Sequence, residues 1–231
     1  MKYSKLPRIY AAECLEENRT FPFDLENYNY LKNVMRLKDG FSIRVYNERD
    51  GEYNAQVKFD SRSGSFKIGE KLREPYAQQI ETWLFAAIIK SDKFELICDM
   101  ATQMGVTKIV PIISERVQKR EVNEARLKKI IMEAARQSER LDSPQLFSPL
   151  DLKDLKNTEC SEIFFANEME QNEEVLNVNS NNIGVLIGPE GGFTEEEIKF
   201  LNNLDFVHSV SLGQNVLRAE TAAISMLARV I

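Results

Sequence analysis

The sequence of 231 residues has few of the side chains from which metal sites and disulfide frameworks are built. It contains three cysteines, far apart at Cys14, Cys98 and Cys160, and a single histidine, His208. Such scattered cysteines match neither a disulfide framework nor a zinc-ligand spacing. The sequence therefore predicts reduced thiols in a cytoplasmic protein and no metal site.

Long apolar stretches are also missing. No run of about 18 apolar residues, the length that spans a bilayer, occurs. Residues 1–10 are polar and do not resemble the core of a secretion signal. We therefore expect no membrane association. Hydrophobic residues make up 43% of the chain, which is enough for one large or two small globular domains.

An excess of positive charge is absent as well: the formal net charge is -6, an unexpected value for a protein that binds nucleic acid. The charge is unevenly distributed, however. Residues 108–140 contain nine basic and five acidic side chains, whereas residues 151–205 contain three and thirteen. The first segment could face phosphate groups, although ordinary solvated helix faces would give the same pattern.

The pattern of the chain changes at Pro75. Before it, residues 41–46 and 53–59 read as strands, and the Asp50-Gly51 signal between them predicts a β-hairpin. After it, strands alternate with helices, which predicts an α/β fold with a parallel sheet. The expected strands are 80–89, 108–113, 162–166, 183–187 and 207–212, and the expected helices are 92–103, 122–141, 194–204 and 220–231. Asp92 with Glu95, and Thr194 with Glu197, have the spacing of helix-capping pairs.

The glycine-rich segment 187–193, Ile-Gly-Pro-Glu-Gly-Gly-Phe, joins a strand to a helix. Ligands in open α/β sheets bind beyond the carboxyl ends of strands, and glycines let the backbone approach a ligand closely. The segment has no lysine, and Glu190 would repel a phosphate, so it suits ribose hydroxyls or a cationic ligand. A tight turn without any ligand is the structural alternative.

A second segment, 211–222, joins the last strand to the last helix. Together, GPEGGFTEEE at 188–197 and LGQNVLRAETA at 212–222 resemble the paired C-terminal motifs of the RsmE family, the uridine-N3 methyltransferases of bacterial small-subunit ribosomal RNA. Segments similar to that family at 7–10, 33–40, 101–106 and 133–140 extend the resemblance over the whole chain. Asn215 stands where the family usually has arginine, and Gln103 where it usually has glutamate.

The resemblance implies a PUA-like β-barrel over residues 1–72 and a SPOUT methyltransferase domain over residues 75–231. The second domain would be an α/β fold with a parallel sheet and a C-terminal trefoil knot that forms the cofactor pocket. The implied cofactor is S-adenosylmethionine, the implied partner is ribosomal RNA, within the small ribosomal subunit, and the implied assembly is a homodimer. Close packing of the last helix between subunits is expected from its small residues, Ala222, Ala223, Ser225 and Ala228.

Three segments that follow strands are expected to bind the cofactor. Their residues are Ala166, Asn167, Glu168, Ile187, Gly188, Pro189, Glu190, Gly191, Gly192, Ser211, Leu212, Gly213, Asn215, Val216 and Leu217, with Thr221 from the last helix.

Arg218 and Glu220 are the expected catalytic residues. Methylation at N3 requires loss of the imide proton of uridine, and the resulting negative charge spreads onto the flanking carbonyl oxygens. Arg218 would stabilise this anion, and Glu220 would take the proton or hold the arginine. A buried ion pair that only fixes the loop is the alternative.

Contacts with RNA are expected from basic and polar residues of both domains, several of them on the helix face opposite its apolar stripe. These residues are Arg8, Arg36, Arg116, Arg126, Arg136, Gln137 and Arg140. A SPOUT methyltransferase with another RNA target, a non-catalytic RNA-binding relative and a nucleotide-binding regulator remain alternative functions.

Overall fold

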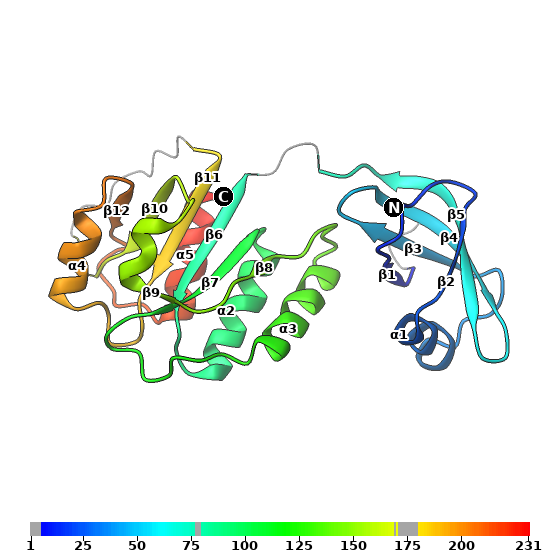
Figure 1. Ribbon diagram of the computed structural model, residues 1–231, viewed down its shortest axis with the longest axis horizontal. Helices are drawn as coiled ribbons and strands as arrows, with labels where there is room; N and C mark the ends of the chain where they lie inside the picture. The colour runs from blue at the N-terminus through cyan, green and yellow to red at the C-terminus, as the bar shows by residue number, and fades with distance from the viewer. Residues whose placement is uncertain (1–5, 77–79, 169, 171–179) are drawn as a thin grey trace. The chain divides into compact units, whose positions relative to one another are not determined.

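The computed structural model describes residues 6–76, 80–168, 170 and 180–231, and the chain divides into two units, Met1–Gln78 and Gln79–Ile231 (Figure 1). Each unit has an apolar core of its own. The division falls close to Pro75, where the pattern of the sequence changes. The domain limits 1–72 and 75–231 themselves stay a prediction.

The first unit contains a five-stranded sheet in the order β1-β3-β4-β5-β2. The expected hairpin is confirmed, because β3 and β4 are antiparallel and Asn47 lies opposite Gly51. Gly51 has a φ of 92°, and a Cβ there would clash with the carbonyl oxygen of Arg73, so the turn requires glycine. The strands are β1 (Arg8–Tyr10), β2 (Thr20–Pro22), β3 (Ser42–Asn47), β4 (Gly51–Phe59) and β5 (Gly64–Arg73).

A helical segment that the sequence analysis did not predict lies between β2 and β3. The short helix α1 (Leu25–Tyr28) continues into a π-helix, η1 (Asn29–Val34). Asp24 begins it by accepting a hydrogen bond from the backbone amide of Asn27 at 2.6 Å. The segment ends at Arg36, which adopts a φ of 55°.

The second unit contains a parallel sheet, as expected, in the order β12-β10-β11-β6-β7-β8, with β9 beside β7. Its strands are β6 (Glu81–Ala87), β7 (Lys108–Ile113), β8 (Gln145–Leu146), β9 (Leu150–Asp151), β10 (Glu162–Ala166), β11 (Asn182–Ile187) and β12 (Val207–Val210). Its helices are α2 (Ser91–Gln103), α3 (Glu124–Gln137), η2 (Leu152–Asn157), α4 (Glu195–Asn202) and α5 (Ala219–Val230).

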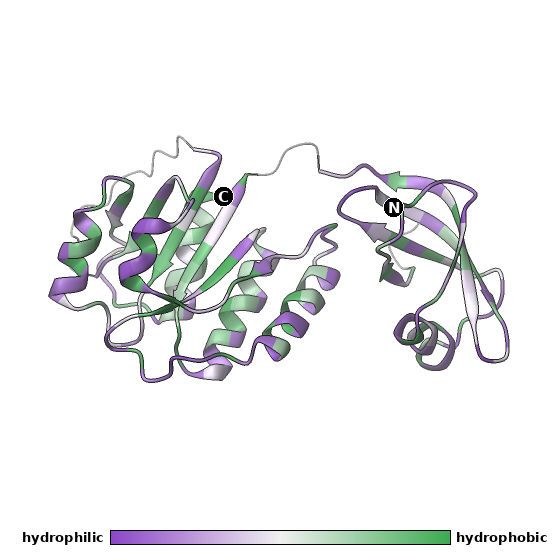
Figure 2. Ribbon diagram, in the orientation of Figure 1, coloured by the Kyte–Doolittle hydropathy of each residue, from purple (hydrophilic) through white to green (hydrophobic). Residues whose placement is uncertain are grey.

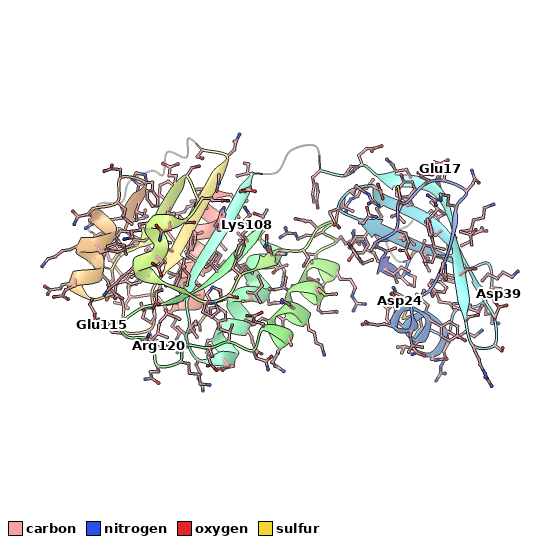
Figure 3. All side chains as sticks on the ribbon, viewed as in Figure 1. Glu17, Asp24, Asp39, Lys108, Glu115 and Arg120 are labelled. Carbon is pink, nitrogen blue, oxygen red and sulfur yellow. The ribbon has the colours of Figure 1, made fainter. Side chains whose placement is uncertain are left out.

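Helices cover both faces of this sheet, which explains why its central strand is apolar along its length. In β6, Leu84 and Ala86 pack in the cluster that includes α2, α3 and α5, whereas Trp83 and Phe85 pack in the cluster that includes α4 and η2. In Figure 2 the strands of the second unit are mainly white to green, whereas α3 and α4 alternate between purple and green. The amino ends of β6 and β7 are polar. Nζ of Lys108, which begins β7 and is labelled in Figure 3, lies 2.9 Å from the carboxylate of Glu81, which begins β6.

Two local predictions about helix ends had different outcomes. The capping box of α4 is confirmed, since Thr194 and Glu197 each accept a hydrogen bond from the other's backbone amide. Asp92 does not cap α2, because the helix begins at Ser91 and its N-cap is Lys90, two residues earlier, which makes no capping side-chain hydrogen bond.

The segment 151–159 is rich in polar residues, yet it is not an irregular loop. It contains η2, and Leu152 and Leu155 are buried against the sheet. Two apolar residues three positions apart lie on the same side of a 3₁₀ helix and are sufficient to fix it on the core.

Candidate functional site

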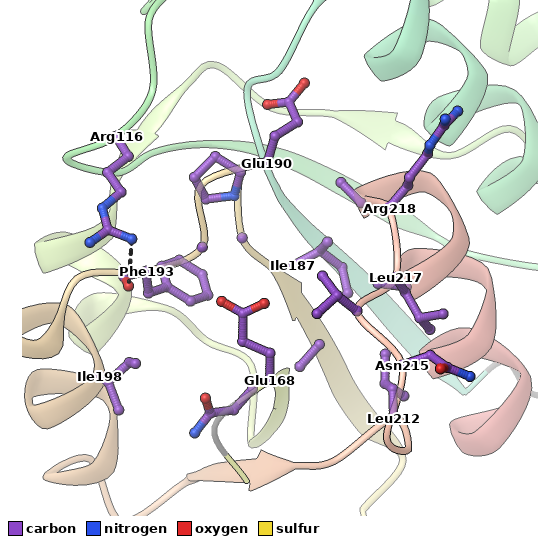
Figure 4. A pocket seen from close by; sticks show the side chains of 18 of the residues that line it. Arg116, Glu168, Ile187, Glu190, Phe193, Ile198, Leu212, Asn215, Leu217 and Arg218 are labelled. Carbon is purple, nitrogen blue, oxygen red and sulfur yellow. Dashed lines mark hydrogen bonds between the residues drawn. The ribbon is translucent and has the colours of Figure 1, made fainter.

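The carboxyl ends of β10, β11 and β12 lie side by side. Phe165 pairs with Leu186 in β11, and Ala166 pairs with Val210 in β12. The segments that follow these strands therefore meet at one edge of the sheet. The order of the strands in the sequence could not establish this by itself. Together they enclose a pocket of about 440 Å³ (Figure 4).

Most of the residues expected to bind the cofactor line this pocket. They are Ala166, Asn167, Glu168, Ile187, Gly188, Pro189, Glu190, Gly192, Leu212, Gly213, Asn215, Val216 and Leu217. The lining also includes residues that the sequence analysis did not assign to the cofactor, namely Arg116, Phe193, Glu195, Ile198, Arg218, Ala219 and Ala222. Phe193 directly follows the glycines, so its position in the sequence could have placed it at the pocket. Arg116 and Ile198 come from other segments, and only the fold shows that these lie near the pocket.

Three of the expected cofactor residues lie outside the lining: Gly191, Ser211 and Thr221. Ser211 is buried and supports the loop, since its hydroxyl accepts from the Gly213 amide at 3.3 Å and its carbonyl accepts from Arg229 at 2.8 Å. Thr221 is exposed on α5. These residues hold or flank the pocket loops rather than face the cavity.

Glycines shape the wall formed by residues 187–193. Gly192 has a φ of 68°, and its amide donates to the Pro189 carbonyl at 2.8 Å, which closes the turn. A Cβ on Gly192 would lie 3.0 Å from Oε1 of Glu168, and one on Gly188 would lie 3.1 Å from the Phe193 ring. The loop can adopt this shape because these positions lack side chains.

The pocket combines apolar walls with acidic side chains. Ile187, Leu212 and Leu217 form part of the walls, and Glu168 and Glu190 are among the acids. In Figure 4, Glu168 lies between Arg116 on one side of the pocket and Arg218 on the other. Such a lining suits a flat apolar group that carries hydroxyls or a positive charge, and it does not suit a bare phosphate.

The structure brings Arg218 to the pocket but not Glu220. Arg218 occupies the N-cap position of α5 and is exposed. Glu220 lies 3.3 Å from Nζ of Lys93, on α2. A hydrogen bond to its own backbone amide lowers the pKa of the Glu220 carboxyl, burial opposes this effect, and Lys93 lowers the pKa further. Glu220 is thus a weak base with a cation as its partner.

Two of the arginines expected to contact RNA are buried, and those predictions are wrong. Arg8 donates to Glu52 at 2.6 Å and stacks on Tyr46 within the first unit. Arg140 donates from Nη1 to two backbone carbonyls in the segment 102–106 and forms a bidentate pair with Asp142. Both guanidinium groups serve the interior of their own unit, where a phosphate has no access.

The other candidates on α3 are neutralised or exposed. Arg126 binds Glu95 at 2.5 and 2.7 Å, and Arg136 binds Glu133 at 2.7 and 2.9 Å. Gln137 is exposed, as is Arg36 in the first unit. The helix face that is basic in the sequence is therefore much less basic in the fold.

The small residues of α5 lie on two sides of the helix. Ala222 and Ala223 are buried in the core of their own unit, whereas Ser225 is half-buried and Ala228 is exposed. Ala222 and Ala223 are therefore not available to a second subunit, and packing of this helix between subunits stays a prediction that Ser225 and Ala228 could serve.

Neither a metal cluster nor a membrane-spanning helix occurs in the part of the chain that the structure describes. In residues 6–76, 80–168, 170 and 180–231, no three His, Cys, Asp or Glu side chains are grouped so that they could hold a metal ion. No helix in the same residues is long and apolar enough to cross a membrane.

Comparisons with known proteins agree with this architecture. Residues 77–231 match the RNA methyltransferase domain family, and residues 23–68 match the RNA methyltransferase PUA domain family. A ribosomal RNA small subunit methyltransferase E from Rickettsia conorii is 40% identical over 237 residues, which cover 100% of this chain and 96% of that protein. The corresponding protein of Mesomycoplasma hyopneumoniae is 33% identical over 88% of this chain and 90% of its own length.

Solved structures agree as well. The crystal structure of a ribosomal RNA small subunit methyltransferase E from Neisseria gonorrhoeae, bound to S-adenosyl methionine, is similar with a TM-score of 0.84 and 25% identity, and the match covers 96% of this chain and 95% of that one. The same family is thus indicated by the paired C-terminal motifs, by the fold of both units and by the full-length sequence matches. The chain belongs to the ribosomal RNA small subunit methyltransferase E family.

Proposed function

We propose that this protein transfers a methyl group from S-adenosylmethionine to N3 of a uridine in 16S ribosomal RNA. The observation that carries the proposal is the pocket made by both C-terminal motifs, in a chain that is 40% identical along its whole length to a family member. The implied trefoil knot is part of the same proposal, since the two motif loops that would form it line one cavity.

The residues of the pocket fit S-adenosylmethionine. Its volume of about 440 Å³ lies within the range of sites for ligands of this size. The apolar walls suit the adenine ring, the acids suit ribose hydroxyls and positive charge, and the glycine loop lets backbone amides approach. When bound, S-adenosylmethionine supplies an activated methyl group whose departure needs no metal ion.

Arg218 stabilises the uridine anion in this proposal. It opens α5 beside the pocket, and a guanidinium can offer two parallel N–H donors to a carbonyl oxygen. Because Arg218 is exposed in the chain by itself, the entering nucleotide would have to exclude water from it. Glu220 holds Lys93 and the start of α5 instead of accepting the proton.

Exposed cations at the carboxyl edge of the sheet are proposed to contact RNA. Lys90 follows β6, and Lys119 and Arg120 follow β7. Val117 packs in one cluster with Ile88, which brings these two segments together. Among the described residues, the ion pairs include none of the three cations, in contrast to Arg126, Lys128 and Arg136 on α3. Arg36 and Gln137 remain candidates because both are exposed.

The salt dependence of RNA binding tests this surface. Replacement of Lys90, Lys119 and Arg120 by alanine should weaken RNA binding and reduce the slope of log affinity against log salt by about two to three units. The double variant Arg126→Ala/Arg136→Ala is the matched control on α3, and its slope should change by less than one unit. Equal changes in both variants would contradict the assignment.

The wider context is carried over from the family. We propose a homodimer that acts in the cytoplasm on RNA within the small ribosomal subunit. Light scattering at micromolar concentration tests the dimer, and a monomer there would contradict it. Parallel reactions on naked 16S RNA and on small subunits from a strain lacking the enzyme identify the substrate form.

Nucleotide mapping tests the reaction itself. The purified protein is incubated with such small subunits and S-adenosylmethionine, and reverse transcription then locates the product. A methyl group on N3 blocks the Watson–Crick edge of uridine, so we expect a new stop at one uridine. Calorimetry should also show binding of S-adenosylhomocysteine and none of ATP. Cofactor binding without any new stop would indicate a non-catalytic relative, and ATP binding would indicate the nucleotide-binding alternative.

A further inference from the structure

The segment that follows β7 holds the glycine loop of the pocket. Nη1 of Arg116 donates to the carbonyl oxygen of Gly191 and, at 3.4 Å, to that of Phe193. These two carbonyls lie on either side of Gly192, the glycine with positive φ that lines the cavity. Figure 4 shows Arg116 reaching this loop from the opposite side to α5.

The neighbouring residue, Glu115, is tied to the same place. Its backbone amide donates to Oε1 of Glu197 at 2.8 Å, and its carboxylate accepts from the Thr194 hydroxyl at 3.3 Å. Thr194 and Glu197 are the two members of the capping box that begins α4. The β7 segment therefore contacts both the glycine loop and the helix start that follows it.

We infer that Arg116 is a positioning residue for the cofactor loop, and that it does not bind RNA phosphate. A loop of glycines has many accessible conformations, and each must be given up when a ligand binds. Donors that fix the carbonyls on both sides of Gly192 restrict the loop before the ligand arrives. The inference rests on the proposed function, since it assigns S-adenosylmethionine to this pocket.

Lysine should replace Arg116 only in part. Both bonds come from Nη1, which the planar guanidinium holds in a fixed direction, whereas an ammonium on a flexible stem serves as a point charge without a fixed direction. Arg116→Ala should raise the KM for S-adenosylmethionine and the Kd for S-adenosylhomocysteine about tenfold, which corresponds to about 1.4 kcal/mol. Its kcat at saturating cofactor should fall less than threefold. Arg116→Lys should recover only part of the lost affinity.

Arg49→Ala is the matched control in the other unit. Arg49 is also exposed and also donates to a backbone carbonyl, that of Glu13 at 3.0 Å, so its replacement removes the same type of bond away from the pocket, together with an ion pair to Asp50. Its Kd for S-adenosylhomocysteine should equal that of the wild type. Melting temperatures of all variants, with and without ligand, accompany the titrations.

Each alternative gives a different result. An RNA contact at Arg116 predicts weaker RNA binding with a salt slope lower by about one unit, and unchanged cofactor affinity. A purely structural role predicts a lower melting temperature in both Arg116 variants with unchanged cofactor affinity. Either result overturns the inference. If the wild type itself binds no S-adenosylhomocysteine, the proposed function fails, whereas equal binding by wild type and Arg116→Ala refutes the positioning role alone.

Discussion

Replacement of Gly192 by alanine should weaken the cofactor site by an amount that its backbone conformation sets. Gly192 has a φ of 68°, a region that costs a residue with a Cβ about 1–2 kcal/mol. The new methyl group would also lie 3.0 Å from Oε1 of Glu168, whose flexible side chain can move aside. The backbone term therefore dominates. If the loop relaxes to avoid the strain, ligand binding must restore it, and affinity should fall about 5–30-fold.

Gly105→Ala is the control for this variant. Gly105 also has a positive φ, 99°, and follows α2 in the same unit, but it does not line the pocket and a Cβ there meets no atom within 4 Å. It should lose stability, because the strain has the same origin, whereas Gly192→Ala should lose less stability by the amount that loop relaxation transfers to ligand binding. Its affinity for S-adenosylhomocysteine should stay that of the wild type.

Calorimetric titration with S-adenosylhomocysteine and thermal melting of the free proteins separate the two effects. Gly105→Ala should melt a few degrees lower and Gly192→Ala by less, and only Gly192→Ala should bind more weakly. Unchanged affinity in Gly192→Ala would show that the loop conformation is irrelevant to the ligand. Equal loss of affinity in both variants would show that general stability, and not the pocket, controls binding.

Three further predictions follow from buried or paired groups. Arg140→Ala should lower the free energy of unfolding by about 2–4 kcal/mol, since it leaves buried carbonyls and Asp142 without their donor, and should not change RNA affinity of the folded protein. The Arg49 guanidinium holds the pKa of Asp50 well below its usual range. The lowered pKa stabilises the fold above about pH 4, so the melting-temperature deficit of Asp50→Asn should shrink as the pH falls further. Burial raises the pKa of Cys98 and of Cys160 to about 12, so a thiol reagent should modify only the exposed Cys14 until denaturant is added.

The regular elements of the second unit could be predicted because the sequence carries their physical cause. A strand covered on both faces must be apolar where it is buried, as β6 is from Trp83 onward, and the expected range 80–89 contains the observed Glu81–Ala87. The capping box at Thr194 was equally explicit. The π-helix η1 and the 3₁₀ helix η2 carried no such pattern. Short irregular helices depend on one or two buried contacts that only the folded core supplies.

The glycine loops could be placed at strand ends, but the sequence could not distinguish their members. Gly191 and Gly192 are adjacent and chemically identical. Only Gly192 has a positive φ and faces the cavity, while a Cβ on Gly191 would lie 3.4 Å from Cδ of Arg116. Their different surroundings come from β7, which is about 80 positions earlier in the chain and shares no local pattern with the loop.

The positions of the arginine side chains were even harder to predict from the sequence, because a guanidinium can be exposed or buried depending on the partners that the fold provides. Helical spacing placed Arg126, Arg136 and Arg140 on a face away from the apolar stripe. Folding then paired Arg126 with Glu95 of α2 and carried Arg140 past the left-handed residue Glu139 into the interior. The number of basic residues along a helix thus gives its charge before any ion pairs form. An RNA phosphate would encounter only the charge left after pairing. Among the described residues, Lys90, Lys119 and Arg120, after β6 and β7, are in no ion pair, and neither is Lys129 on α3.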